Sequence, residues 1–350
     1  MRLKLRALPI LSILSVAILT ACGGGGGGGG DASSNNSQPQ PAAVATTEVF
    51  VGDSIVARLE NGTQKTVSLA NANDSTGYGQ GYSKKGDVLL IPTTSGIAVY
   101  NMAMSSVVRE IPLTGQIVNV RHLDDNTALV LRRRERYSFT NSDRPLTEAN
   151  NLLTVNLTTG EVSRTLRLGS EGTHLANGLS VDASASTAWV VLTPPYGQQG
   201  KVLKISLSSS AIDEVSGVTG EALACGESAS TFFLCYAGGR GIALSKSDGR
   251  LVPLTHETES QGYAEDATYS YYSLFNSAQL VRVNKATGSK ETVSTGANPT
   301  AIFLGKNGEV LVIDSDPATT PSKRRLMKHT FTGGSSEVYS AESLDQYSFK

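Results

Sequence analysis

Short runs of Val, Leu and Ile alternate with polar turns along most of the chain, from about residue 48 to the C-terminus. Almost no stretch repeats its apolar residues every 3.6 positions, as an amphipathic helix would. Thirty-six glycines, together with abundant Ser and Thr, separate the apolar runs. Short strands between frequent turns predict an all-β fold.

One unit recurs along this part of the chain: a short apolar strand, a polar turn and another strand. Equivalent turn positions fall at residues 62, 106, 160, 210, 249, 288 and 334, at spacings of 44, 54, 50, 39, 39 and 46 residues. A period near 45 residues is typical of the four-stranded blades of a β-propeller. We therefore predict seven blades, with six or eight as the alternatives. The seven copies lie at 55–62, 97–101, 152–160, 202–206, 242–249, 280–288 and 326–334.

The strands between these turns fit the propeller interpretation, and the two ends of the chain predict how the ring closes. The first copy begins at 48–51 without an innermost strand, and residues 346–349 are a surplus segment at the other end. We expect the C-terminal strand to complete the first blade, because closure removes exposed strand edges. The alternative is a frayed tail. The expected strands of the fourth copy are 177–182, 187–192, 202–207 and 211–215, and those of the sixth are 261–267, 269–275, 280–284 and 290–294.

Two segments carry a family resemblance. Residues 280–288, Leu-Val-Arg-Val-Asn-Lys-Ala-Thr-Gly, and residues 173–182 resemble the repeats of YVTN/YncE-type and quinoprotein-like propellers. The chain differs from the quinoprotein pattern because no tryptophan follows each Thr-Gly, and Trp189 is the only tryptophan. The resemblance therefore implies a propeller but does not imply a bound quinone, and it implies a fold more strongly than an activity.

The N-terminal segment has the three parts of an export signal. Basic residues begin it, an apolar run follows at 8–19, and Leu-Thr-Ala-Cys closes it at 19–22. The run is too short for a spanning helix. Its last four residues resemble the bacterial lipobox, which implies a lipid on Cys22 and removal of residues 1–21. The alternative is an ordinary signal peptide that ends near a cysteine.

A polar, glycine-rich stretch separates this signal from the repeats. Residues 23–30 are eight consecutive glycines, and a stretch rich in Ser, Asn, Gln and Pro follows. Such a composition cannot bury enough apolar surface to fold. We expect a signal peptide at 1–21, a lipidated flexible tether at 22–47 and a propeller at 48–350. By analogy with lipoproteins of Gram-negative bacteria, Gly23 favours the outer membrane of the cell envelope.

Charge excludes one class of partner. Without Arg2, Lys4 and Arg6, 27 of the 30 basic residues remain against 31 acidic ones, a formal charge of −4. Nucleic-acid binding needs a basic footprint, so we expect no nucleic-acid partner. We expect a monomer.

Two cysteines besides Cys22 are present, Cys225 and Cys235. An oxidising compartment favours their pairing. They lie at equal distances from a turn centred near Ser230, which would place them opposite each other on adjacent strands. We predict a disulfide; the alternatives are two buried thiols or a redox pair, although no Cys-X-X-Cys spacing supports the last.

No residue pattern identifies a reaction. The four histidines, His122, His174, His256 and His329, lack the spacing of a zinc site. His174 precedes Asn177 where some propeller lactonases gather metal ligands, but the carboxylates of such a set are missing. We expect these two residues to stabilise a turn. No nucleophile elbow or phosphate loop occurs, so we name no catalytic residue and expect no metal or other cofactor.

The connections between strands suggest a binding face. The strands of a blade are lettered A to D from the inside. The B–C and D–A connections of all blades then open on the same face of the ring. Three B–C connections are long, at 139–150, 193–200 and 315–322. Arginine and tyrosine on loops held by a rigid ring are typical of a recognition surface; the alternative is solvated decoration. The candidate residues are Arg132, Arg133, Arg134, Asp143, Arg144, Tyr196, Gln198, Lys323, Arg324, Arg325, Tyr82 and Tyr263.

These patterns lead to one hypothesis and two alternatives. The hypothesis is a lipid-anchored, non-catalytic propeller that binds a protein or glycan of the cell envelope through this face. The alternatives are a lactonase-like hydrolase with its site at the central channel and a receptor for a small solute. A carboxylate cluster or metal in the channel mouth would favour the hydrolase.

Overall fold

The computed structural model describes most of the chain between residues 45 and 349, and these residues belong to one compact unit, Ala42–Lys350. None of them forms a helix long and apolar enough to span a membrane. The described ranges are 45–51, 54–59, 63–69, 81–93, 95–133, 149–168, 174–182, 184, 186–194, 199–218, 220, 222–236, 241–253, 260–274, 277–304, 309–316, 323–332, 334–341 and 344–349.

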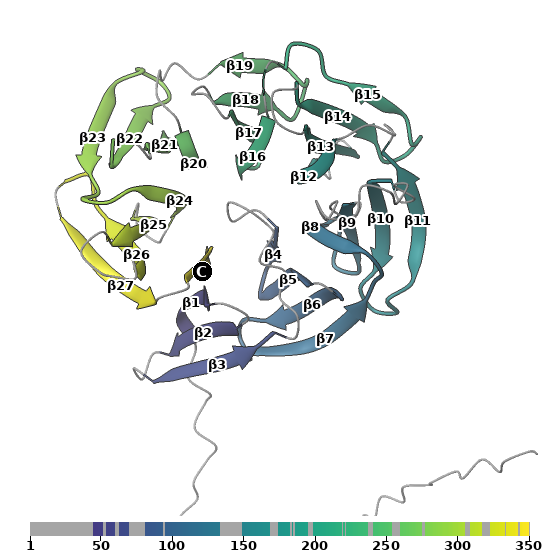
Figure 1. Ribbon diagram of the computed structural model, residues 1–350, viewed down its shortest axis with the longest axis horizontal. Coiled ribbons are helices and arrows are strands. Elements are labelled where there is room, and N and C mark those ends of the chain that lie inside the picture. Colours follow the sequence, from purple (N-terminus) through teal and green to yellow (C-terminus); the bar gives the residue numbers. More distant parts are fainter. Residues whose placement is uncertain are drawn as a thin grey trace, which may run out of the picture. The chain divides into compact units, whose positions relative to one another are not determined.

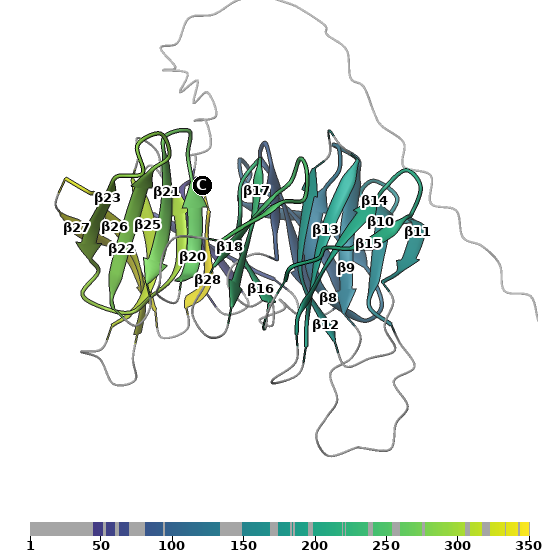
Figure 2. The same cartoon turned by 90° about the horizontal axis from the view of Figure 1, so that it is seen from above.

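The described residues form seven antiparallel sheets of four strands each. The sheets follow one another around a ring, each with one edge strand at the centre and the other at the rim (Figure 1). From the side, the strands of each sheet cross the thickness of the ring (Figure 2). The all-β, seven-bladed prediction is confirmed.

The blades are numbered along the chain, and their strands run from A, the innermost, to D. Blade 1 consists of β28 (Leu344–Phe349), β1 (Ala45–Val51), β2 (Ser54–Leu59) and β3 (Gln64–Ser68). Blade 2 consists of β4 (Ser83–Lys85), β5 (Val88–Thr93), β6 (Gly96–Asn101) and β7 (Ser106–Pro112). Blade 3 consists of β8 (Gln116–His122), β9 (Thr127–Arg133), β10 (Asn151–Asn156) and β11 (Val162–Arg167). Blade 4 consists of β12 (Leu175–Asp182), β13 (Thr187–Thr193), β14 (Lys201–Ser206) and β15 (Ile212–Glu214). Blade 5 consists of β16 (Ala222–Glu227), β17 (Thr231–Tyr236), β18 (Ile242–Ser245) and β19 (Leu251–Pro253). Blade 6 consists of β20 (Ser260–Glu265), β21 (Tyr269–Leu274), β22 (Gln279–Asn284) and β23 (Lys290–Ser294). Blade 7 consists of β24 (Pro299–Leu304), β25 (Val310–Asp316), β26 (Lys323–His329) and β27 (Ser335–Ala341).

The C-terminal strand closes the ring. β28 pairs antiparallel with β1, with Phe349 opposite Glu48 and Leu344 opposite Val51. Blade 1 therefore takes its innermost strand from the C-terminus and its other three strands from the N-terminal part of the propeller, as the sequence predicts. In blades 4 and 6, every strand end lies within two residues of its expected position.

The core lies between neighbouring blades. In β9, all four residues from Ala128 to Leu131 are at most 1% exposed, and the same holds for the five from Ala188 to Leu192 in β13. One apolar cluster joins Leu129 of blade 3 to Val190 of blade 4. Because these B strands are covered on both faces, their sequences are continuously apolar rather than alternating.

The C–D turns of blades 3 to 6 repeat one geometry. In each turn a backbone N–H bonds to the carbonyl four residues earlier, at 2.8 to 2.9 Å, and the donor residue has a positive φ. The sequence period rests on these same positions, which favour glycine because L side chains are strained there. The donors are Gly160 (φ 79°), Ser210 (φ 64°), Gly249 (φ 74°) and Gly288 (φ 71°).

Two of these glycines allow a matched stability test. A Cβ at Gly288 would meet no atom within 4 Å, whereas a Cβ at Gly249 would lie 2.8 Å from Cη2 of Trp189. Gly288→Ala should therefore cost only the backbone strain, about 1 kcal/mol, and Gly249→Ala should cost about 1–3 kcal/mol more from overpacking. Urea unfolding of the two variants measures the difference; equal costs would contradict the packing of Trp189 on this turn.

Glycine also allows the inner strands to converge. A Cβ at Gly178 in β12 would lie 2.1 Å from Cβ of Ala224 in β16, and a Cβ at Gly226 would lie 2.7 Å from the carbonyl oxygen of Tyr263 in β20. Each of these glycines follows a β-bulge in its strand. The bulges bend the inner strands, and the missing side chains let neighbouring strands approach at the crowded centre.

Cations of the outer strands join successive blades. Lys65 of β3 donates from Nζ to the carbonyl oxygen of Met104 in blade 2, at 3.0 Å. Arg109 of β7 donates to the carbonyl oxygen of Leu157, and Arg164 of β11 donates to that of Leu207. Blades 1, 2 and 3 thus each reach the C–D turn of the next blade.

Candidate functional site

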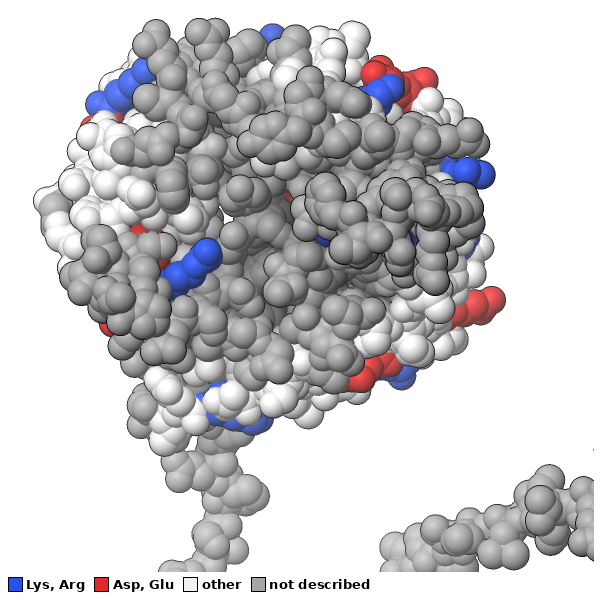
Figure 3. Space-filling view, in the orientation of Figure 1, with Lys and Arg blue, Asp and Glu red and all other residues white. Residues whose placement is uncertain are grey.

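Topology places the long B–C connections on one face, because every B strand ends there. Figure 3 shows one face of the ring, on which the described charged side chains are scattered and of both signs. Five residues of the predicted recognition face lie outside the described residues: Arg134, Asp143, Arg144, Tyr196 and Gln198.

Two predicted arginines are held against their own blade. Arg132 donates from Nη1 to the carbonyl oxygen and to Oγ1 of Thr114, both at 3.3 Å. Arg133 donates from Nε to Oε1 of Gln116, at 3.1 Å. Both side chains are half-buried at the end of β9. Gln116 belongs to β8 of the same blade, and Thr114 lies in the connection that leads from β7 into β8.

Arg325 is part of an ion pair, which differs from its predicted role. Nε and Nη2 of Arg325 donate to the two carboxylate oxygens of Asp314, at 2.9 and 3.1 Å. Asp314 lies opposite Arg325 in the adjacent strand and is fully buried. A two-pronged pair of this kind fixes β26 on β25. Arg324 is half-buried opposite Ser315, and Lys323 begins β26.

Of the two predicted tyrosines, one is buried and the other is partly exposed. Tyr263 is only 5% exposed, its ring stacks on Phe233, and its hydroxyl hydrogen-bonds to Glu265 and Ser270. Tyr263 is therefore a core residue, and its assignment to an exposed face is wrong. Tyr82 is half-buried, and its carbonyl oxygen accepts a hydrogen bond from Arg121.

A buried charge cluster, absent from the sequence predictions, lies at the other end of the inner strands, where the A–B turns lie. Glu227 ends β16, and its carboxylate contacts Nε of Arg121 from β8 at 2.5 Å and Nζ of Lys246 at 3.2 Å. The hydroxyl of Ser180 in β12 donates to Glu227 Oε2 at 2.6 Å. The side chains of Arg121 and Lys246 are 7% and 4% exposed, and that of Glu227 is 26% exposed.

Arg121 extends this cluster to blade 2. Its Nη1 donates to the carbonyl oxygen of Tyr82 at 2.9 Å and to Oδ1 of Asn119 at 2.6 Å. Burial would raise the pKa of Glu227, but the charges of Arg121 and Lys246 and the Ser180 hydroxyl hold it below its usual range. The carboxylate therefore stays ionised and connects blades 2 to 5 around the centre of the ring.

Blade 6 repeats part of the cluster. Glu265 ends β20 as Glu227 ends β16, and its Oε2 lies 2.7 Å from Nζ of Lys285. Lys285 and Lys246 are the first residues after their C strands. The two glutamates lie 38 residues apart and the two lysines 39 apart, close to the repeat spacing. A search for charges at the repeat period would have found this pair.

The cluster provides structural charge pairing rather than an available nucleophile. Ser180 is fully buried and donates its proton to Glu227. Among the residues that the structure describes, no three His, Cys, Asp or Glu side chains are placed to hold a metal ion.

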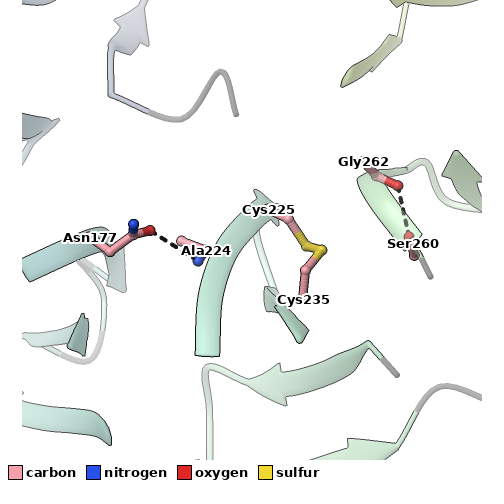
Figure 4. The surroundings of a disulfide bond; sticks show 6 residues. All are labelled: Asn177, Ala224, Cys225, Cys235, Ser260 and Gly262. Carbon is pink, nitrogen blue, oxygen red and sulfur yellow. Dashed lines mark hydrogen bonds between the residues drawn. A yellow bond between two sulfur atoms is a disulfide. The ribbon is translucent and has the colours of Figure 1, made fainter. Parts of the chain in front are cut away.

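The structure joins Cys225 and Cys235 by a disulfide (Figure 4). Cys225 occupies the bulge of β16, so Cys235 lies opposite Leu223 rather than opposite Cys225 as expected. The two Cα atoms are 5.8 Å apart, within the usual range for a disulfide. The bond connects strands A and B of blade 5 inside an apolar cluster.

Removal of this disulfide is expected to destabilise the propeller moderately. The sequence separation is 10 residues, and closing so short a loop contributes about 2–3 kcal/mol in the chain-entropy model. The double variant Cys225→Ser/Cys235→Ser should lose at least this amount in urea unfolding. Unfolding curves of the unmodified protein that coincide with and without reductant would contradict the contribution.

His174 and Asn177 stabilise contacts beyond their own turn. Nε2 of His174 hydrogen-bonds to the carbonyl oxygen of Gln199 at 2.9 Å, and its own carbonyl oxygen accepts from Asn150 of blade 3 at 3.0 Å. Oδ1 of Asn177 accepts from the backbone N–H of Ala224 in blade 5, at 3.3 Å (Figure 4). Both residues therefore hold blade 4 against its neighbours.

Comparison with known proteins supports the fold and leaves the family open. No protein-family model matches the chain, and no curated protein sequence matches it. The fold resembles the β-propeller domain of Cps50 (Swd1) from Myceliophteria thermophila, with a TM-score of 0.51 and 12% identity over 77% of this chain and 93% of that one. It also resembles the computationally designed Ika8 protein, with a TM-score of 0.52 and 12% identity over 87% of this chain and 88% of that one. A chain of the mitotic checkpoint complex is similar as well, with a TM-score of 0.53 and 12% identity over 77% of this chain and 80% of that one. The protein is a seven-bladed β-propeller.

Proposed function

We propose that this protein is a lipid-anchored β-propeller of the cell envelope that binds a protein or glycan partner, without catalysis, through its B–C face. The observation that carries the proposal is the unequal length of the B–C connections on a closed ring. The connection in blade 2 spans only the residues between Thr93 and Gly96, whereas that in blade 3 spans those between Arg133 and Asn151. A rigid ring that carries long loops on one face is a usual scaffold for recognition.

Two further observations support a binding role. The ring is closed by β28, which leaves its inner strands paired and gives the loops fixed anchor points. One of the similar structures is a chain of the mitotic checkpoint complex, so the same fold serves in a protein assembly. The sequence supports the proposed location at the cell envelope, because the lipobox-like residues 19–22 and the glycine-rich stretch after them fit a tethered lipoprotein.

The anchor has its own test. Cells that express the full chain should incorporate labelled palmitate into the protein, and Cys22→Ala should abolish the label and release the protein from the membrane fraction. Label that persists in the variant would refute lipidation at Cys22.

The binding face is tested by capture from envelope extract. The first bait is the unmodified chain from Ala45 onward. The second bait is the same chain with the double variant Arg134→Glu/Arg144→Glu in the long connection of blade 3. Arg250→Glu is the control, because Arg250 lies at the opposite end of the ring and its side chain is 74% exposed. We expect one partner that the double variant loses and the control retains. Equal capture by all three baits would refute the proposed face.

A further inference from the structure

The first and last strands of the propeller meet the ring at the end where the A–B turns lie. β1 is strand B of blade 1, and a B strand starts at the A–B end of its blade and finishes at the B–C end. Ala45, the first residue of β1, therefore lies at the A–B end. β28 runs antiparallel to β1, with Phe349 opposite Glu48, so it finishes at that same end (Figure 2). The segment 22–44 is thus joined to the ring on the side opposite the long B–C connections.

The connections at this end of the ring are short. The A–B connections range from two residues in blade 2 (86–87) to five in blade 7 (305–309), and every C–D connection has four or five residues. A connection of five residues that returns to the next strand can project at most about 10 Å. The B–C connection of blade 3 (134–150) can project about 30 Å by the same measure. A bilayer surface can therefore approach the A–B end more closely than the B–C end.

The length of the segment 22–44 opposes inversion of the ring. A Gly-rich chain of this length has a random-coil span of about 25–30 Å. To turn the B–C face towards the membrane, this chain has to pass outward across β2 and β3, about 10 Å, and along the height of a seven-residue strand such as β1, about 23 Å. The inverted ring therefore stretches the segment beyond its average span, whereas a ring with its A–B end towards the membrane does not.

We propose, on the basis of the lipid anchor and binding face of the proposed function, that the A–B end of the ring faces the anchoring membrane and the B–C face is turned to the aqueous compartment. The partner is then a molecule that reaches the propeller from that compartment. A protein embedded in the anchoring membrane would instead meet the A–B end, where the connections are short. The point of attachment thus selects the partner by the side from which it approaches.

Energy transfer to the membrane surface tests this orientation. The lipidated chain is reconstituted in vesicles whose lipid headgroups carry a fluorescent acceptor, and a donor dye is attached to Ser277→Cys or to Ser289→Cys. Both are exposed serines of blade 6, Ser277 in the B–C connection and Ser289 in the C–D turn. The six residues of β22 lie between them and separate the two dyes by about 20 Å. Transfer from position 289 should be several-fold stronger than transfer from position 277.

Each other outcome identifies the claim that fails. Equal transfer from the two positions, or stronger transfer from position 277, would overturn the orientation and leave the lipid anchor intact. No transfer from either position would mean that the lipid does not hold the ring at the membrane, which would overturn the anchor of the proposed function as well. A partner that is photo-crosslinked from position 144 and is embedded in the anchoring membrane would overturn the choice of partner but not the binding face.

Two altered chains test whether the point of attachment causes the orientation. Lengthening the segment 22–44 roughly fourfold with Gly and Ser raises its span to about 50–60 Å, which exceeds the path around the ring, so the two transfer values should converge.

The second chain is a circular permutant in which a linker joins β28 to β1, whose ends lie side by side, and the lipidated segment enters the long B–C connection of blade 3. Exposed connections tolerate such cuts. The order of the two transfer values should reverse, and an unchanged order would overturn the proposal. Should the permutant fail to fold, the lengthened chain decides, because an undiminished difference between positions 277 and 289 would also overturn it.

Discussion

Truncation after Ser343 is expected to destabilise the propeller more than removal of the disulfide or loss of the Glu227 carboxylate. The truncated chain lacks β28, so β1 loses its inner partner and blade 1 is left with three strands. At about 1 kcal/mol for each lost hydrogen bond, the expected loss is on the order of 5 kcal/mol, or about 10 °C in the melting temperature.

Two controls make this result specific to closure. A chain that lacks only Lys350 keeps the whole of β28 and should melt like the full protein. A synthetic peptide of residues 344–350, added to the truncated chain, should restore part of the lost stability by filling the vacant edge. A truncated chain that melts within about 2 °C of the full protein, a difference of less than about 1 kcal/mol, would contradict closure by the C-terminal strand.

Glu227→Gln is expected to be the most costly conservative substitution. It leaves Arg121 and Lys246, both more than nine-tenths buried, without their counter-charge. Breaking a buried pair costs about 3–5 kcal/mol, and we expect the lower end because Glu227 is 26% exposed. Glu214→Gln is the control: Glu214 and its partner Lys201 are 54% and 35% exposed, so the loss should stay below about 1 kcal/mol. Urea unfolding at neutral pH compares them, and equal losses would contradict the buried network.

The same carboxylate predicts an acid dependence. The folded pKa of Glu227 lies below 4.5, its usual value, so its contribution is complete above pH 4.5 and is lost as the pH falls through the depressed value. The free energy of unfolding of the unmodified protein should therefore fall more steeply below pH 4.5 than that of Glu227→Gln. Parallel curves would contradict an ionised, paired Glu227.

The blades can be predicted from the sequence because their strongest signals are local. The turns at Gly160, Gly249 and Gly288 require a positive φ, and that need puts the same residue type at a fixed period. The missing inner strand of the first copy and the surplus C-terminal segment likewise follow from counting strands. Neither inference needs a contact between distant residues.

The side-chain assignments depend on contacts that local patterns do not show. The sequence-based assignment places Tyr263 on a recognition face although the residue falls in the expected strand 261–267. In the structure Tyr263 lies in β20 and stacks on Phe233 of the neighbouring blade. The pattern assigns Arg325 to a recognition surface, but Arg325 pairs with Asp314, which lies in the preceding strand on the other side of the long connection. The apolar pattern of the repeat does not reveal this polar pair. Arg121 and Glu227 are 106 positions apart, and only the ring brings them together.

The most direct test of the proposed binding face is site-specific photo-crosslinking in living cells. A photoreactive amino acid is placed at Arg144, in the long connection of blade 3, and, as a control, at Arg250 on the opposite end of the ring. A recognition propeller predicts one crosslinked envelope partner from position 144 and none from position 250. The same products from both positions, or a partner from position 250 alone, would contradict recognition through the B–C face.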